Sequence, residues 1–68
     1  MARLNYQHLY YFWTVAKSGT ITRASERLGL SQPTISSQIA AFEKAIDSQL
    51  FHKDGRRLTL TDAGRQIF

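Results

Sequence analysis

The sequence contains no cysteine and only one proline, and no apolar run approaches the ~20 residues that a helix needs to cross a bilayer. Without cysteine there is no disulfide, so a reducing, cytoplasmic compartment is the simplest interpretation. No signal-peptide pattern opens the chain. His8 and His52 are far apart, and no carboxylate pair, metal-ligand spacing or phosphate-binding glycine loop is found. We therefore predict no catalytic activity, no metal, no cofactor and no membrane contact.

Acidic residues are also few, with five Asp and Glu against nine Lys and Arg and a net charge of +4. A chain of 68 residues forms one small domain, and a domain of this size buries only ~60% of its unfolded surface. Its core must therefore be built well from the apolar residues, which make up 43% of the chain. The excess of positive charge favours a polyanionic partner such as nucleic acid. The alternative is that the charge has no such role.

Apolar residues at helical spacing predict three helices. The three stripes consist of Leu9, Phe12, Trp13 and Ala16, then Ile21, Ala24 and Leu28, then Ile35, Ile39, Phe42 and Ile46. Asn5 and Thr20 are the expected N-caps of the first two helices, and Gly19 and Gly29 end them. The third helix is expected at about residues 32–46.

The connection between the second and third helices is the most specific local feature. Gly29 permits the left-handed backbone that ends one helix, and Ser31 caps the next only two residues later. A turn this short fixes the two helices at a steep angle, which is typical of a helix-turn-helix.

The periodicity changes in about residues 50–60, where Asp54-Gly55 separates two short runs that contain apolar residues. This pattern predicts a β-hairpin with a type I′ turn, which needs positive φ at both central positions. Thr61 then caps a further helix, inside which the chain stops. The fold class is therefore mainly α, a winged helix-turn-helix over residues 1–60 with the start of another helix at 61–68.

The third helix presents an uncharged face opposite its apolar stripe. The candidate DNA contacts near its start are Gln32, Thr34, Ser36 and Ser37. Hydroxyls can bond base edges and phosphates, Ala and Thr methyl groups can touch the thymine methyl, and Gln32 can pair with adenine. The alternative is that these side chains only cap the helix or cover a solvated face. The helix-turn-helix context favours contact with DNA over this alternative. Gln38 lies near the apolar arc and is expected to make a structural hydrogen bond instead.

The hairpin tip and the second helix supply the candidate phosphate contacts Lys53, Arg56, Arg57 and Arg23. A basic hairpin beside a recognition helix suits the phosphate backbone or the adjacent minor groove. The alternative is that these cations keep an edge strand soluble. Arg27 is outward as well, but a surface pair with Glu26 or Glu43 explains it equally well.

Three motifs carry a family resemblance: F-x-x-V-A-x-x-G-T-x-T-R-A-S-x-x-L-x-x-S-Q-P-T-x-S-x-Q-I, F-E-x-x-I-D-x-x-L-F and R-x-L-x-L-T-x-A-G. From about Leu9 to Gly64 the chain resembles the N-terminal DNA-binding domain of the LysR-type transcriptional regulators. The opening LNYQHLYYFW is similar to the branch that contains the sodium–proton antiporter regulator.

The resemblance implies a bacterial regulator that binds double-stranded operator or promoter DNA. It implies a linker helix, starting at Thr61, that pairs two chains into a homo-oligomer. It also implies a C-terminal domain, absent from this chain, that takes a small-molecule effector. The family's DNA contacts, carried over position by position, fall on Gln32, Pro33, Thr34, Ser36 and Ser37 and on Lys53 and Arg56 of the wing.

The sequence departs from the family pattern at three positions. Family members often carry Arg where this chain has Ser37 and Ala40, which puts guanine recognition by this helix in doubt. Asp47 stands where glycine is usual, so the corner after the third helix is expected to be slightly strained.

Our interpretation is a sequence-specific DNA-binding domain. The runner-up is a winged helix that binds proteins, whose binding would be far less sensitive to salt.

Overall fold

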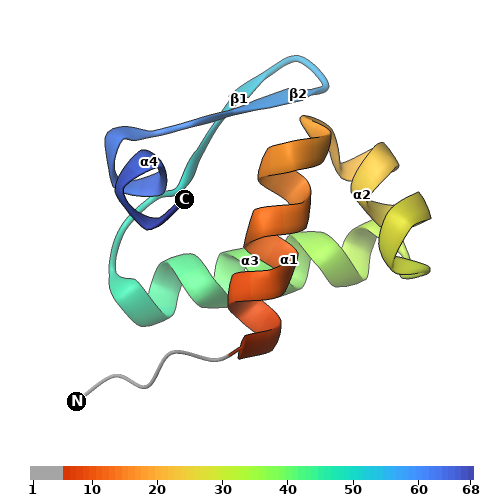
Figure 1. Ribbon diagram of the computed structural model, residues 1–68, viewed down its shortest axis with the longest axis horizontal. Helices are drawn as coiled ribbons and strands as arrows, with labels where there is room; N and C mark the ends of the chain where they lie inside the picture. The colour runs from red at the N-terminus through yellow and green to blue at the C-terminus, as the bar shows by residue number, and fades with distance from the viewer. Residues whose placement is uncertain (1–5) are drawn as a thin grey trace.

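The computed structural model describes residues 6–68, and its elements follow the predicted order (Figure 1). They are α1 (Tyr6–Ser18), α2 (Ile21–Leu28), α3 (Gln32–Ile46), β1 (Phe51–Asp54), β2 (Arg57–Leu60) and α4 (Asp62–Ile67). In Figure 1, α1 crosses α3, α2 lies at the N-terminal end of α3, and the β1–β2 hairpin extends over the end of α1. This arrangement is a winged helix-turn-helix, as predicted. Within the described part of the chain, no helix is both long enough and apolar enough to span a membrane.

The helix boundaries follow the local sequence signals. Thr20 caps α2 by accepting a hydrogen bond from the backbone N–H of Arg23 at 3.1 Å. Gly19 and Gly29 both adopt positive φ, at 82° and 66°, and end α1 and α2 as predicted. The expected N-cap of α1, Asn5, lies outside the described residues.

Both ends of α3 also match the prediction. Ser31 caps the helix, its hydroxyl accepting from the N–H of Thr34 at 3.3 Å. At the other end Asp47 adopts the left-handed conformation, with φ 53° and ψ 43°. It is the one non-glycine residue with positive φ among residues 6–68. The strain predicted for this corner therefore has a structural basis.

The core joins the predicted helical stripes to the base of the hairpin. The buried apolar residues are Phe12, Val15, Ala24, Ile35, Ile39, Phe42, Leu50 and Phe51. The ring of Phe12 lies between those of Phe42 and Phe51, with centroids 5.9 and 5.4 Å away. Trp13, although part of the predicted stripe of α1, remains 46% exposed at the edge of the core.

The hairpin forms, but its turn differs from the prediction. The register pairs Asp54 with Arg57, so the two central turn residues are Gly55 and Arg56 rather than Asp54 and Gly55. Only Gly55, at φ 63°, has positive φ. A glycine at the first central position alone is the pattern of a type II′ turn, so the predicted type I′ turn is wrong. The shift places Arg56 at the tip of the hairpin.

Candidate nucleic-acid interface

The start of α3 presents the expected uncharged face to solvent. The five candidates Gln32, Pro33, Thr34, Ser36 and Ser37 are all exposed, whereas Ile35 and Ile39 between and beyond them are buried. The wheel prediction for this helix is therefore confirmed. Gln38 is half-buried as expected, but within residues 6–68 its side chain makes no hydrogen bond, so the predicted structural bond is absent.

The hydroxyl of Thr34 has a second role that the sequence pattern did not indicate. Its Oγ1 lies 2.7 Å from Oγ of the capping residue Ser31, so the two hydroxyls bond to each other at the start of α3. Part of the hydrogen-bonding capacity of Thr34 is therefore used within the protein. Its methyl group and the rest of the hydrogen-bonding capacity of its hydroxyl are available to a ligand.

A groove separates the start of α3 from the wing, by which we mean the hairpin formed by β1 and β2. It has a volume of about 500 Å³. Gln32 and Ser36 of α3 line one side, and Lys53 and Arg56 of the wing line the other. Thr22, at the start of α2, also lines it. The fold therefore brings candidates from two separate sequence segments to one surface.

Arg57 lies on a different side of the wing. Paired residues of an antiparallel ladder share a face, so Lys53 lies on one face with Leu58, and Arg57 on the other with Asp54. Arg57 instead lines a second depression together with Arg23 of α2. The four candidate cations thus form two groups, Lys53 with Arg56 and Arg23 with Arg57.

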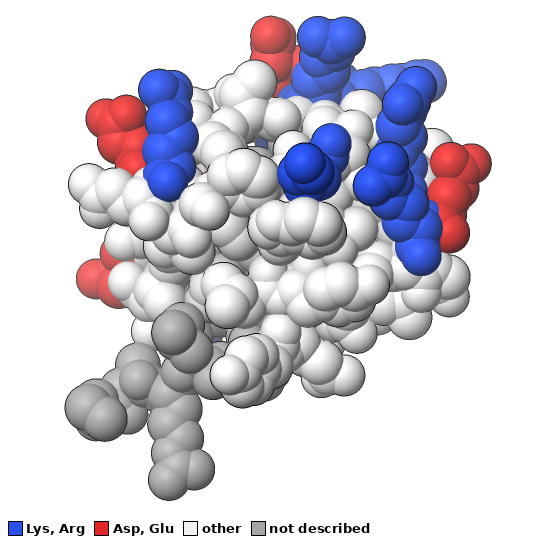
Figure 2. Space-filling view, viewed as in Figure 1, with Lys and Arg blue, Asp and Glu red and all other residues white. Residues whose placement is uncertain are grey.

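The candidate cations lie on the wing and on α2, beside the uncharged face of α3. Figure 2 shows the Lys and Arg side chains gathered mainly over the wing and the α2 side of the molecule. Within residues 6–68 neither Arg23, Arg27 nor the wing cations form an ion pair, so the alternative pairing of Arg27 with a glutamate is not found. Nor does the described part of the chain gather three or more His, Cys, Asp or Glu side chains that could hold a metal ion.

The wing is tied to the helices by backbone contacts that local sequence signals do not reveal. The N–H of Leu58 donates to the carbonyl of Gly19 at 2.9 Å, and Thr20 forms an isolated antiparallel bridge with Arg57. The junction between α1 and α2 thus pairs with β2 through a single β-bridge. This pairing fixes the wing next to the start of α2.

Two side chains hold the base of the wing. Glu43 of α3 accepts hydrogen bonds at Oε2 from the N–H groups of Leu50, at 2.7 Å, and Phe51, at 3.4 Å. On the other side, the hydroxyl of Thr61 donates to the carbonyl of Gln49 at 2.6 Å. Local sequence signals predict Thr61 only as a helix cap and Glu43 only as a surface ion-pair partner. Both are links between elements.

The glycine of the L-T-D-A-G motif is required by close packing. Gly64 is buried in α4, and its N–H donates to Oγ1 of Thr61 at 3.0 Å. A Cβ at this position would collide with the carbonyl oxygen of Leu50 and lie 3.0 Å from Cδ2 of Leu60. A glycine inside a helix costs stability, so its presence is a signal of such a close approach.

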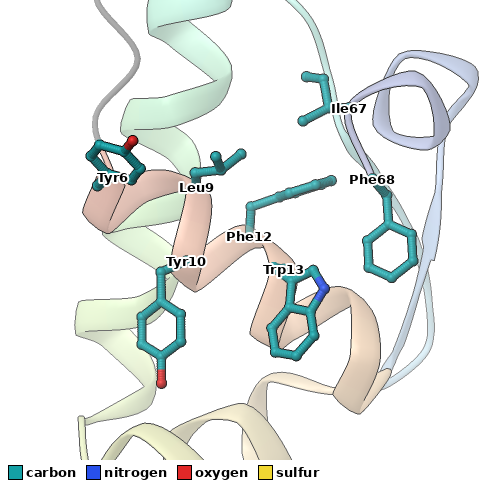
Figure 3. Close-up of a pocket in the computed structure, with 7 residues that line it drawn as sticks. All are labelled: Tyr6, Leu9, Tyr10, Phe12, Trp13, Ile67 and Phe68. Atoms are coloured by element: carbon teal, nitrogen blue, oxygen red, sulfur yellow. The ribbon is translucent and has the colours of Figure 1, made fainter.

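A second surface, which includes none of the four candidate cations, is apolar. A groove between α1 and the end of α4 is lined by Tyr6, Leu9, Tyr10, Phe12, Trp13, Ile67 and Phe68 (Figure 3). Several of these side chains are strongly exposed, with Tyr6 at 87% and Phe68 at 51%. Exposed aromatic surface on this scale is typical of a contact surface for another polypeptide.

Comparison with known proteins agrees with this geometry. The family model described as bacterial regulatory helix-turn-helix protein, lysR family, matches residues 6–65. The chain belongs to the LysR family. The winged helix-turn-helix described above is the DNA-binding domain of that family.

Among relatives, the chain is 41% identical over all 68 residues to the transcriptional activator protein NhaR of Escherichia coli K12, and covers 23% of that protein. Among solved structures, it superposes on the CbnR DNA-binding domain in complex with DNA with a TM-score of 0.88 and 35% identity. That match covers 93% of this chain and 72% of the other. The BenM DNA-binding domain, in complex with benA site 1 DNA, matches with a TM-score of 0.87 and 30% identity over 93% and 73% of the two chains.

Proposed function

We propose that this domain binds double-stranded DNA in a sequence-specific manner as part of a bacterial transcriptional regulator. In this proposal the start of α3 lies in the major groove and the wing contacts the phosphate backbone or the adjacent minor groove. The observation that carries it is the groove at which Gln32 and Ser36 of the uncharged face meet Lys53 and Arg56 of the wing. Small hydroxylated side chains allow a helix to approach base edges closely, while the flanking cations attract the duplex.

The two groups of cations serve different parts of the duplex in this proposal. Arg56 lines the groove beside α3, and in the proposal it enters the minor groove next to the major-groove site. Arg23 and Arg57 line a separate depression, and in the proposal they neutralise the flanking phosphate backbone. Both groups are exposed and carry no internal ion pair within residues 6–68, so their charges are available to DNA.

The apolar groove supports a further part of the proposal, which is that the full-length regulator is a homo-oligomer. The chain spans about a quarter of the length of its relative NhaR, and α4 ends beside the exposed aromatic residues of α1. We propose that α4 is the start of a linker helix at residues 61–68 that pairs two copies. The winged helix-turn-helix then occupies residues 1–60, and any small-molecule effector binds a C-terminal domain outside this sequence.

Selection of bound duplexes from a random pool tests the role of α3, using the wild type, Ser37→Arg and Ala45→Arg. Arg at position 37 can reach a guanine bidentately or grip a phosphate, and a good bidentate pair is worth ~1–3 kcal/mol of discrimination. Ser37→Arg should therefore either favour sequences that carry a guanine in reach or strengthen random-sequence binding more than binding of the selected sequence. Ala45→Arg adds the same charge at an exposed position near the other end of α3.

The two variants should therefore differ. If Ser37→Arg changes neither the selected sequence nor the ratio of selected to random binding beyond what Ala45→Arg does, this face of α3 does not read DNA. Binding that is weak and insensitive to salt would instead support a protein-interaction module, because DNA binding weakens steeply as salt rises.

A further inference from the structure

Glu43 joins the two elements that carry the proposed DNA contacts. It belongs to α3, three residues beyond Ala40 of the outward face, and its side chain is half-buried toward the wing. Oε2 accepts from the backbone N–H groups of Leu50 at 2.7 Å and Phe51 at 3.4 Å, where the chain enters β1. Glu43 also lines a depression together with Ser36 of α3 and Lys53 of β1, so it lies between the two sets of candidate contacts.

The segment that Glu43 holds is the only covalent path from α3 to the wing. It turns at Asp47 in the left-handed conformation, and the N–H of Ser48 returns to the backbone carbonyl of Glu43 at 3.0 Å. Thus the backbone and the side chain of one residue both bind the outgoing chain. Within residues 6–68, no other side chain of α3 hydrogen-bonds to the hairpin or to the segment that leads into it.

We propose that Glu43 is a positioning residue for DNA binding: its carboxylate fixes the angle of the wing to α3, so that the wing tip and the outward face of α3 engage one duplex together. This inference rests on the proposed function. Two linked contact surfaces gain affinity only when their geometry permits simultaneous engagement. A wing that moves freely loses this gain although every contacting side chain remains present.

A double-mutant cycle between Glu43→Ala and Arg56→Ala tests the proposal. Arg56 lies in the turn of the hairpin, at the opposite end of the ladder from Phe51, and within residues 6–68 it forms no hydrogen bond or ion pair with Glu43. The effects of the two changes should therefore add, unless the position of the wing couples them. Glu26→Ala is the matched control, because it removes one carboxylate from an exposed position of α2 and changes the net charge equally. Affinities are measured for a duplex selected by the wild-type chain and for a permuted duplex.

All variants are measured at one salt concentration and at a temperature where circular dichroism shows each of them folded. Glu43→Ala should weaken binding of the selected duplex about tenfold more than Glu26→Ala does, and binding of the permuted duplex much less. In the wild-type background Arg56→Ala should also lower the affinity for the selected duplex about tenfold. In the Glu43→Ala background the same change should lower it by less than about twofold. A residue that only stabilises the fold would leave the effect of Arg56→Ala unchanged.

Glu43→Gln provides a second variant, because it keeps an acceptor oxygen at nearly the same place. It should restore most of the affinity for the selected duplex and most of the sensitivity to Arg56→Ala. The proposal is overturned if Arg56→Ala costs the same factor in all three backgrounds, or if Glu43→Ala and Glu26→Ala bind the selected duplex equally. If the wild-type chain itself fails to bind DNA in a salt-dependent way, the proposed function fails, which is a distinct outcome.

Discussion

Replacing Gly64 by alanine has two opposing effects on stability. Alanine has the higher helix propensity, but its Cβ disturbs the packing of α4 on the base of the wing. In an exposed helix this change stabilises by about 1 kcal/mol, because alanine is the better helix former. In this structure the added Cβ would collide with the carbonyl oxygen of Leu50, which is backbone and cannot rotate away. It would also lie 3.0 Å from Cδ2 of Leu60.

The magnitude follows from the balance of these two effects. Overpacking a buried site by one carbon costs about 1–3 kcal/mol, so after the gain in helix preference a net loss of about 1 kcal/mol is expected. For a domain of this size, 1 kcal/mol lowers the melting temperature by about 4–8 °C. Thermal denaturation followed by circular dichroism measures this directly.

Gln66→Gly is the control, because it introduces a glycine at an exposed position of the same helix, where no close packing is involved. It should destabilise only by the helix preference of about 1 kcal/mol, or less if the end of α4 frays. The packing argument for the L-T-D-A-G glycine is wrong if Gly64→Ala melts at or above the wild-type temperature.

Two further predictions concern a helix end and self-association. Asp47→Asn should raise the free energy of unfolding by about 0.5 kcal/mol. Asparagine accepts the left-handed conformation, and the change removes a negative charge from the C-terminus of α3. Asp62→Asn, in the first turn of α4, should not raise it. Equal melting temperatures for the two variants would contradict this reasoning. The 68-residue chain should sediment mainly as a monomer at micromolar concentration, because α4 is too short to pair stably by itself. A tight dimer at that concentration would indicate that the apolar groove at Ile67 and Phe68 already forms a complete interface.

The features that the sequence predicted well are those set by neighbouring residues. Gly29 favours the left-handed backbone that ends α2, and Ser31 favours the N-cap position of α3. The helix-turn-helix could therefore be inferred from neighbouring residues alone. The exposed face of α3 followed from helical periodicity alone. The turn type could not be predicted as well, because Asp-Gly is compatible with two registers and the ladder of paired strand residues selects one.

The contacts that the sequence missed join residues from separate elements. The bonds from Glu43 to the entry of β1 depend on the path of the chain around Asp47, which no local pattern specifies. The grouping of Arg57 with Arg23, rather than with Lys53, depends on which face of the hairpin turns toward α2. Such long-range placements decide how the candidate contacts divide over the surface, and they require the folded structure.

The most direct test of the central claim is to observe which backbone amides respond when DNA is bound. The ¹⁵N-labelled chain is titrated with a duplex that it selects from a random pool, and amide chemical shifts are followed at two salt concentrations. We expect the largest changes at residues 32–37 of α3 and 53–57 of the wing, and we expect apparent affinity to fall steeply at the higher salt concentration. If those amides stay unchanged while the signals of Tyr10 and Trp13 on the apolar groove move, the proposed DNA-binding surface is wrong.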